Sequence, residues 1–162
     1  QSRVGTGPVP TELIDDVGKH LQTVGKEFGA TTGRPRRCGW LDLAIVRYSH
    51  MLSGFTSIAL TKVDILSGLP EVKVCTGYSA RGRTLRVPPA DMALFAECEP
   101  QYTELDGWED PGQEAWRRAA REGLGALPPN CRDYVEFVEQ ELGVPVHFVG
   151  VGPGRTETLD LR

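Results

Sequence analysis

The stretch at residues 31–40, Thr-Thr-Gly-Arg-Pro-Arg-Arg-Cys-Gly-Trp, is the most informative part of the chain. Three arginines fall within four positions, directly after two threonines and a glycine. The guanidinium fork matches carboxylate and phosphate geometry, and hydroxyl and backbone N–H groups add further donors. Pro35 fixes its own φ and pushes Arg34 toward an extended conformation, which predicts a stiffened loop and not a helix interior. We therefore expect a loop that binds a small anionic ligand.

A helix is predicted to begin near Trp40 and to end at about Ser53, so its N-terminus would directly follow the arginines. The dipole of such a helix would add to the attraction for an anion. The plain alternative is a solvated charged turn, which any cluster of arginines can form. The neighbouring threonines and glycine, together with the predicted helix start, favour the anion site.

The composition bounds the class of protein. With 162 residues, of which 40% are hydrophobic and 25% charged, the chain is typical of one soluble globular domain. A net charge of −4 argues against a general nucleic-acid partner, and the basic residues lack interleaved aromatics, which disfavours an RNA-binding arginine loop. No apolar run approaches the roughly 20 residues that span a bilayer, and no secretory signal opens the chain. We expect neither a nucleic-acid nor a membrane partner.

The four cysteines are widely scattered and include no Cys-x-x-Cys pair: Cys38, Cys75, Cys98 and Cys131. With three histidines elsewhere, no zinc-ligand spacing occurs, so no metal site is predicted. Reduced thiols are typical of a cytoplasmic protein. Because the chain opens at Gln1 on a loop-like glycine-rich stretch, we expect a piece of a longer protein.

Hydrophobic periodicity and turn residues predict a mixed α/β fold, a sheet with packed helices, and no domain boundary. Helices are predicted over residues 12–28, 40–53 and 129–142, with a short one inside 88–97. Strands are predicted over residues 56–61, 71–78, 84–87, 101–105, 144–150 and 156–161. The charged, glycine-containing region at 106–125 is expected to lie on the surface.

A second candidate site is Thr61-Lys62-Val63-Asp64, at the end of a predicted apolar strand. Guanine nucleotide-binding proteins use a strand-terminal Asn-Lys-x-Asp for the base. The aspartate accepts hydrogen bonds from the ring N–H and amino groups of guanine, and adenine lacks that donor pair. The lysine stem can lie along the face of the base. A charge pair where a strand leaves for a loop is the plain alternative for so short a motif.

Glycines at residues 150–154 follow another predicted strand and permit close backbone approach to a flat ligand, although a plain turn has the same composition. The same holds for residues 4–8. No G-x-x-x-x-G-K-[ST] phosphate loop occurs. His20 and His50 fall in predicted helices and have a structural or exposed role in this interpretation. No nucleophile, base and orienting group occur as a set.

Taken in order, these motifs closely resemble the C-terminal part of adenylosuccinate synthetase, over essentially the whole chain. The resemblance is most specific around residues 29–41. The matching motifs are Arg-Val-Gly-x-Gly-Pro at 3–8, Glu-Phe-Gly-Ala-Thr-Thr-Gly-Arg-Pro-Arg-Arg-Cys-Gly-Trp-Leu-Asp at 27–42, Leu-Thr-Lys-Val-Asp-Ile-Leu at 60–66, Gly-Trp at 107–108, Leu-Pro at 127–128, Gly-Val-Pro-Val at 143–146 and Val-Gly-Pro-x-Arg at 151–155.

The resemblance implies that residues 1–162 are a single C-terminal segment of a larger P-loop-NTPase-like fold with a central, mainly parallel sheet. That family joins IMP to L-aspartate with GTP and Mg²⁺, giving adenylosuccinate, GDP and phosphate in AMP biosynthesis. The IMP 6-oxygen is phosphorylated first, and the aspartate amine then displaces the phosphate. The resemblance also implies a cytoplasmic homodimer as the full enzyme.

The resemblance implies roles for particular residues. The aspartate loop would contain Ala30, Thr31, Thr32, Gly33, Arg34, Pro35 and Arg36. IMP would contact Val4 and Arg34. GTP would contact Arg36, Lys62, Val63, Asp64, Gly150, Val151 and Gly152. Since Gly150 and Val151 stand where many members have Ser-Thr, contacts with guanine at that place would come from the backbone.

The family's N-terminal phosphate loop, its catalytic aspartate (which also binds magnesium) and its histidine acid have no counterpart in these residues. The arginine loop would supply positioning and charge stabilisation, but no proton transfer. The segment alone is therefore expected to be inactive, with no catalytic or metal-binding residue of its own. The alternative, from a different class, is a truncated paralogue that binds a guanine nucleotide or a dicarboxylate without catalysis.

Overall fold

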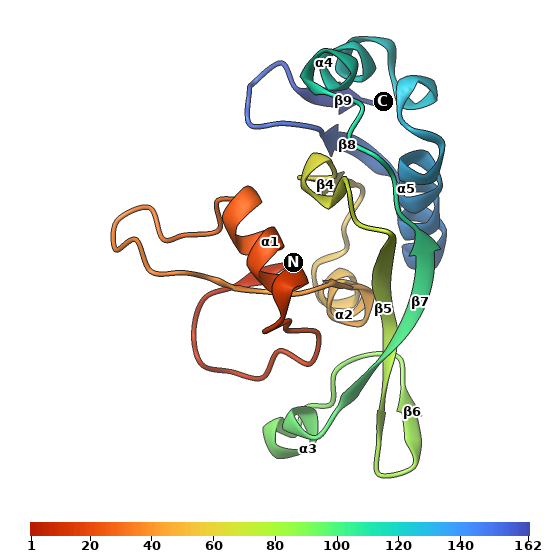
Figure 1. Cartoon of the computed structure of the whole chain (residues 1–162). Helices are drawn as coiled ribbons and strands as arrows, with labels where there is room; N and C mark the ends of the chain where they lie inside the picture. Colours follow the sequence, from red (N-terminus) through yellow and green to blue (C-terminus); the bar gives the residue numbers. More distant parts are fainter. The chain divides into compact units, whose positions relative to one another are not determined.

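The computed structural model describes residues 1–162, and Figure 1 follows the elements along the chain. The chain forms two compact units, each built from two stretches of sequence. Unit 1 contains Gln1–Leu52 and Lys73–Glu104, and unit 2 contains Ser53–Val72 and Leu105–Arg162. The helices, with both parallel and antiparallel strand pairs, confirm the predicted mixed α/β class. No helix combines the length and the apolar character that crossing a lipid bilayer requires.

In unit 1 the N-terminal strand β1 (Ser2–Arg3) pairs antiparallel with β2 (Arg37–Cys38). Beyond it, Leu13 N donates to the carbonyl oxygen of Cys38 at 2.9 Å. Glycine is required at Gly39, because a β-carbon there would lie 1.9 Å from the carbonyl oxygen of Thr11. The two stretches of chain thus lie backbone to backbone.

Helix α1 (Asp16–Val24) begins four residues later than the sequence predicts. Asp15 caps it by accepting a hydrogen bond from Gly18 N at 2.9 Å. Residues 12 and 13 cannot be helical because they pair with residues 38 and 39 in an extended conformation. Thr11, just before these residues, is fully buried, and its hydroxyl accepts a hydrogen bond from the Gln1 side chain at 2.8 Å.

A four-stranded sheet centres on β5 (Glu71–Ala80). It pairs in parallel with β3 (Leu41–Asp42), antiparallel with β6 (Arg83–Leu85), and also with β7 (Glu99–Asp106). The helices of this part of the chain are α2 (Leu43–Ser53) and α3 (Met92–Ala96). Strands β5 and β6 and the short helix α3 lie close to the ranges that the sequence predicts, 71–78, 84–87 and 88–97.

A fully buried carboxylate joins β3 to α2. Asp42 accepts hydrogen bonds from Ile45 N at 3.1 Å and from the Tyr78 hydroxyl at 2.6 Å. Burial raises the pKa of Asp42, and it raises the pKa of the adjacent Cys75 thiol to about 12. The Tyr78 ring meets Phe95 edge to face, with centroids 5.7 Å apart. One acidic side chain therefore fixes the start of α2 against the sheet.

Unit 2 is built on a three-stranded sheet with the strand order β4-β8-β9. Strand β4 (Ile58–Leu60) pairs in parallel with β8 (Val146–Gly150), which pairs antiparallel with β9 (Thr158–Asp160). The helical elements are η1 (Asp64–Leu66), α4 (Gln113–Glu122), η2 (Leu124–Ala126) and α5 (Pro129–Leu142). As predicted, α5 begins at a proline and ends at Gly143, whose φ of +66° suits glycine.

Residues 106–125 lie largely on the surface, as predicted, but the side chains of Trp108, Trp116 and Ala119 are buried. Trp108 and Trp116 are each only 5% exposed. The Trp116 indole N–H donates to Asp110 at 3.0 Å, and the Trp108 ring lies 5.7 Å from that of Tyr134. Helix α4 is amphipathic: Trp116 and Ala119 lie on its buried face, and charged residues cover the other face. The average composition of the region does not reveal this buried face.

Replacing Tyr78 by phenylalanine should lower the free energy of unfolding by about 1–3 kcal/mol, because Asp42 would stay buried with one hydrogen bond fewer. Urea denaturation of the variant and the parent chain measures this difference. The matched control is Tyr48→Phe, at a tyrosine that is 40% exposed, and it should change the unfolding free energy by less than about 0.5 kcal/mol. Equal effects of the two substitutions would contradict the role given to the Asp42–Tyr78 bond.

Candidate functional site

The arginine-rich loop of unit 1 is a short loop whose two ends, at Phe28 and Pro35, pair with each other. Phe28 pairs with Pro35, and Gly29 N donates to the carbonyl oxygen of Arg34 at 2.8 Å. Gly33 turns the chain with a φ of +64°, and its N–H donates back to the carbonyl oxygen of Gly29 at 2.9 Å. Every residue from 30 to 35 is exposed. The predicted stiff loop is thus present and presents its side chains to solvent.

The three arginines have different surroundings. Arg37 forms a two-pronged pair with Glu12, at 2.9 and 2.5 Å, and lowers the pKa of that carboxyl group. It also donates to the carbonyl oxygen of Gly7 at 2.7 Å, so it holds the N-terminal glycine stretch. Arg36 pairs with Glu27 at 2.9 Å, and its Nε is buried without a partner. Arg34 is exposed and makes no side-chain hydrogen bond or ion pair.

The predicted contribution of a helix dipole to this loop is wrong. Helix α2 begins at Leu43, after both β2 and β3, and not directly beyond the arginines. The carboxylate of Asp42 already accepts a hydrogen bond from the first turn of that helix. The guanidinium groups are consequently the only strong anion-binding groups that the loop offers.

The second candidate site lies in unit 2, where two parallel strands end together. Val63 N, just beyond β4, donates to the carbonyl oxygen of Gly150 at the end of β8, at 3.1 Å. A β-carbon on Gly150 would lie 3.3 Å from the α-carbon of Thr61, so glycine allows this close approach. Lys62 has a left-handed φ of +64°, which is uncommon outside glycine and asparagine. The parallel pairing therefore joins the Lys-x-Asp motif to the glycine turn.

Asp64 is half-buried and starts the short helix η1. Burial raises its pKa, and the negative charge of Glu157 raises it further. Backbone N–H groups of Asp64 and Ile65 and the charge of Lys62 act in the opposite direction. One carboxylate oxygen, Oδ1, is buried and accepts no hydrogen bond. An acceptor in this condition is suited to a ligand that brings N–H donors.

The glycine turn at residues 150–154 is held from beneath by Glu157, a residue that the sequence analysis missed. Its carboxylate accepts from Gly154 N at 2.7 Å and from Arg117 Nε at 3.1 Å. Its backbone carbonyl oxygen accepts from Val151 N at 2.9 Å. An acidic residue a few positions after a glycine turn is the only sequence signal of this arrangement, and it is a weak one.

The predicted site residues therefore form two groups. In unit 1 are Val4, Ala30, Thr31, Thr32, Gly33, Arg34, Pro35 and Arg36, and in unit 2 are Lys62, Val63, Asp64, Gly150, Val151 and Gly152. Val4 is 78% exposed. Val63 and Val151 are 1% and 2% exposed, so neither residue presents its side chain to a ligand.

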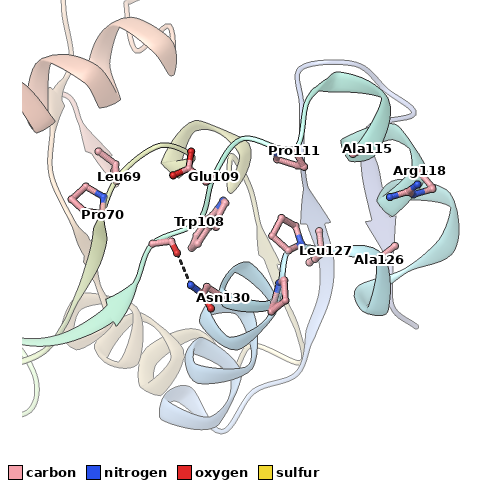
Figure 2. Close-up of a pocket in the computed structure, with 13 residues that line it drawn as sticks. Leu69, Pro70, Trp108, Glu109, Pro111, Ala115, Arg118, Ala126, Leu127 and Asn130 are labelled. Atoms are coloured by element: carbon pink, nitrogen blue, oxygen red, sulfur yellow. Dashed lines mark hydrogen bonds between the residues drawn. The ribbon is translucent and has the colours of Figure 1, made fainter.

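Unit 2 also has a hollow of about 600 Å³ that none of the predicted residues lines. Figure 2 shows Trp108 near its middle, with Leu69 and Pro70 on one side and Leu127 on the other. Asn130 closes part of the wall by donating to the carbonyl oxygen of Gly107 at 2.6 Å. Its only charged lining residues are Glu109 and Arg118 (Figure 2), and the lining contains no pair of nucleophile and general base.

Nowhere in the chain do three or more His, Cys, Asp or Glu side chains gather in a way that would hold a metal ion. The four thiols are buried and unpaired by disulfides. The donor set of these residues therefore does not fit a magnesium ion, and no chemical step through one can be derived from them.

The sequence profile described as Adenylosuccinate synthetase matches residues 1–159. The chain belongs to the adenylosuccinate synthetase family. It is 49% identical over 98% of its length to the adenylosuccinate synthetase of Caldicellulosiruptor bescii, and 51% identical over 98% to that of Mycosarcoma maydis. Members of this family are ligases of purine biosynthesis.

A solved structure, the fully ligated adenylosuccinate synthetase from Plasmodium falciparum, matches the whole chain with a TM-score of 0.89 and 36% identity. This chain covers 38% of that protein, and 36% and 35% of the two relatives above. It thus spans little more than a third of the length of the adenylosuccinate synthetases that it matches.

Replacing Asp64 by asparagine should stabilise the chain at neutral pH. Because folding raises the pKa of Asp64, its contribution to stability is full below the ordinary aspartate value of about 3.9 and is lost as the pH rises through the raised value. Asparagine carries no buried charge, so the thermal midpoint should rise by about 2–4 °C at pH 7, as about 1 kcal/mol does in a chain of this size. This gain should vanish in acid.

Thermal unfolding followed at neutral and at acidic pH measures this gain. Asp133→Asn, at a carboxylate that is 64% exposed on α5, is the matched control and should leave the midpoint unchanged at both pH values. A midpoint for Asp64→Asn that falls at pH 7 would show that the carboxylate stabilises the fold, contrary to this assignment.

Proposed function

We propose that this chain is the C-terminal part of an adenylosuccinate synthetase and supplies the aspartate loop and the guanine-binding residues of that enzyme. The complete protein would join IMP and L-aspartate with hydrolysis of GTP. Family membership supports the reaction class. The observation that carries the residue roles is the buried, unpaired Oδ1 of Asp64 beside a turn of close-packed glycines.

Guanine has a ring N–H and an amino group on one edge, and an ionised carboxylate accepts from both. The Oδ1 atom of Asp64 accepts no hydrogen bond within the chain, so it is available to these donors. Binding them would remove the free-energy cost of burying that oxygen without a partner. Adenine has no matching pair of donors, so this carboxylate would discriminate between the two bases. In this proposal Lys62 lies along the base, while residues 150–152 and Val63 contact it through their backbone.

The arginine loop would receive the two carboxylates of L-aspartate. Arg34 supports this role because its guanidinium group is exposed and has no partner within the chain. Thr32 and the loop backbone add donors beside it. Arg34 would also contact IMP, together with Val4, and Arg36 would reach GTP. Arg37 has no part in this proposal because Glu12 and backbone carbonyl groups already occupy its guanidinium.

Magnesium would be required by the complete enzyme, with ligands outside residues 1–162. We further propose a homodimer and a cytoplasmic location for that enzyme. The four cysteines form no disulfide, which supports the location because reduced thiols are typical of a reducing compartment.

A second candidate is a truncated paralogue that binds a guanine nucleotide or a dicarboxylate without catalysis. Such a paralogue would use the same base site, so the buried Oδ1 of Asp64 supports it as well. The mass of the natural protein distinguishes the two: a mass equal to that of these residues supports the paralogue, and one near that of the relatives supports the enzyme.

Calorimetric titration of this chain with GDP and ADP tests the base site. We expect GDP to bind at least about tenfold more tightly than ADP, since a site built for hydrogen bonding rejects a ligand that leaves it unpaired. Asp64→Asn should abolish that preference, because an amide presents N–H groups to the N–H groups of guanine. The preference should persist in Asp133→Asn. Equal affinities for GDP and ADP in the parent chain would refute the proposed base site.

A coupled assay with IMP, L-aspartate, GTP and Mg²⁺ tests the catalytic assignment. This polypeptide alone should give no measurable turnover, because the arginine loop offers charge but no group that transfers a proton near neutral pH. Substantial turnover by the chain, retained after chromatography and lost in Arg34→Gln, would show that these residues hold the whole catalytic machinery.

A further inference from the structure

Glu157 lies between the glycine turn and helix α4. Its side chain is 7% exposed and accepts hydrogen bonds from Gly154 N at 2.7 Å and from Arg117 at 3.1 Å. A β-carbon on Gly152 would lie 2.5 Å from the Glu157 carboxylate, so the turn rests directly on that group. This carboxylate consequently fixes the path of the backbone that is proposed to meet the base.

Two backbone hydrogen bonds connect Glu157 to the neighbourhood of Asp64. The carbonyl oxygen of Glu157 accepts from Val151 N at 2.9 Å, and that of Gly150 accepts from Val63 N at 3.1 Å. The ionisable groups that act on Asp64 are Glu157, which raises its pKa, and Lys62, which lowers it; Asp64 in turn raises the pKa of the Cys131 thiol of α5. Arg117 of α4 is paired only with Glu157.

We propose that Glu157 is a positioning residue for the guanine site whose negative charge opposes the ionised form of Asp64, and that Arg117 partly offsets this charge. This inference rests on the proposed base site and assigns it two further residues. Glu157 holds the turn through its hydrogen bonds and influences Asp64 through its charge. The hydrogen bond and ion pair of Arg117 are with Glu157, so we assign its influence on Asp64 to that pair.

The two charges should have opposite effects on the pH dependence of GDP binding. Affinity should rise with pH as Asp64 ionises, since only the carboxylate accepts both donors of the base. Glu157→Gln removes a negative charge and lowers the pKa of Asp64, so the rise should move to lower pH. Arg117→Gln exposes the charge of Glu157, so the rise should move to higher pH. In the double variant the rise should lie where it does in Glu157→Gln.

Calorimetric titration of this chain with GDP, from acidic to neutral pH, measures these shifts. Glu157→Ala should also weaken GDP binding about tenfold at neutral pH through loss of the bond to Gly154 N, and Glu157→Gln, which keeps an acceptor, should restore most of it. The matched control is Arg121→Gln, an exposed arginine of α4 paired with Glu114, which should leave the profile unmoved. If the Glu157 variants do not fold, Arg117→Gln decides alone.

A merely structural role would weaken binding equally at every pH in both single variants. Either that result or an unchanged pH profile would overturn the roles given to Glu157 and Arg117. A preference of the parent chain for GDP over ADP would still support the base site. Absence of GDP binding by the parent chain overturns the base site, and this inference with it.

Discussion

The parallel pairing of β4 with β8 is the constraint on which the candidate base site depends. The two strands are separated by more than eighty residues in sequence, yet their pairing is in parallel and their carboxyl ends meet at one edge. The carboxyl edge of parallel strands is where α/β proteins place their ligands. Without this pairing, Lys62 to Asp64 and residues 150–152 would be two unrelated turns. With it, the acidic side chain of Asp64 and the glycine turn at residues 150–152 lie at the same edge of the sheet.

Stability and function are opposed at that corner. Burial makes the charged form of Asp64 unfavourable and leaves one oxygen without a hydrogen bond, and Lys62 adopts a backbone conformation that few residues prefer. Such features persist where the surrounding structure enforces them, and they concentrate at functional sites. In the arginine loop the two roles fall to different residues. Arg37 stabilises the fold through its pair with Glu12, whereas Arg34 is exposed and makes no side-chain hydrogen bond or ion pair.

The sequence predicted most elements because their signals were local. Pro129 and Gly143 delimit α5, and the glycine at position 82 forms the hairpin turn. What could not be predicted depended on contacts between distant residues. Helix α1 starts late because residues 12 and 13 pair with 38 and 39, and Trp108 is buried by residues far along the chain. Similarly, the motifs pointed to the candidate residues. The different partners of the three arginines and the hydrogen bond from Gly154 N to Glu157 could be seen only in the structure.

The contact between Gly152 and Glu157 has an evolutionary consequence. A side chain at position 152 would displace the carboxylate at position 157 from its hydrogen bond with Gly154 N. A substitution at one position is therefore expected to favour a substitution at the other. Among homologues, the residues at positions 152 and 157 should therefore covary, and the strength of that covariation would reflect how strictly the backbone path of the turn is constrained.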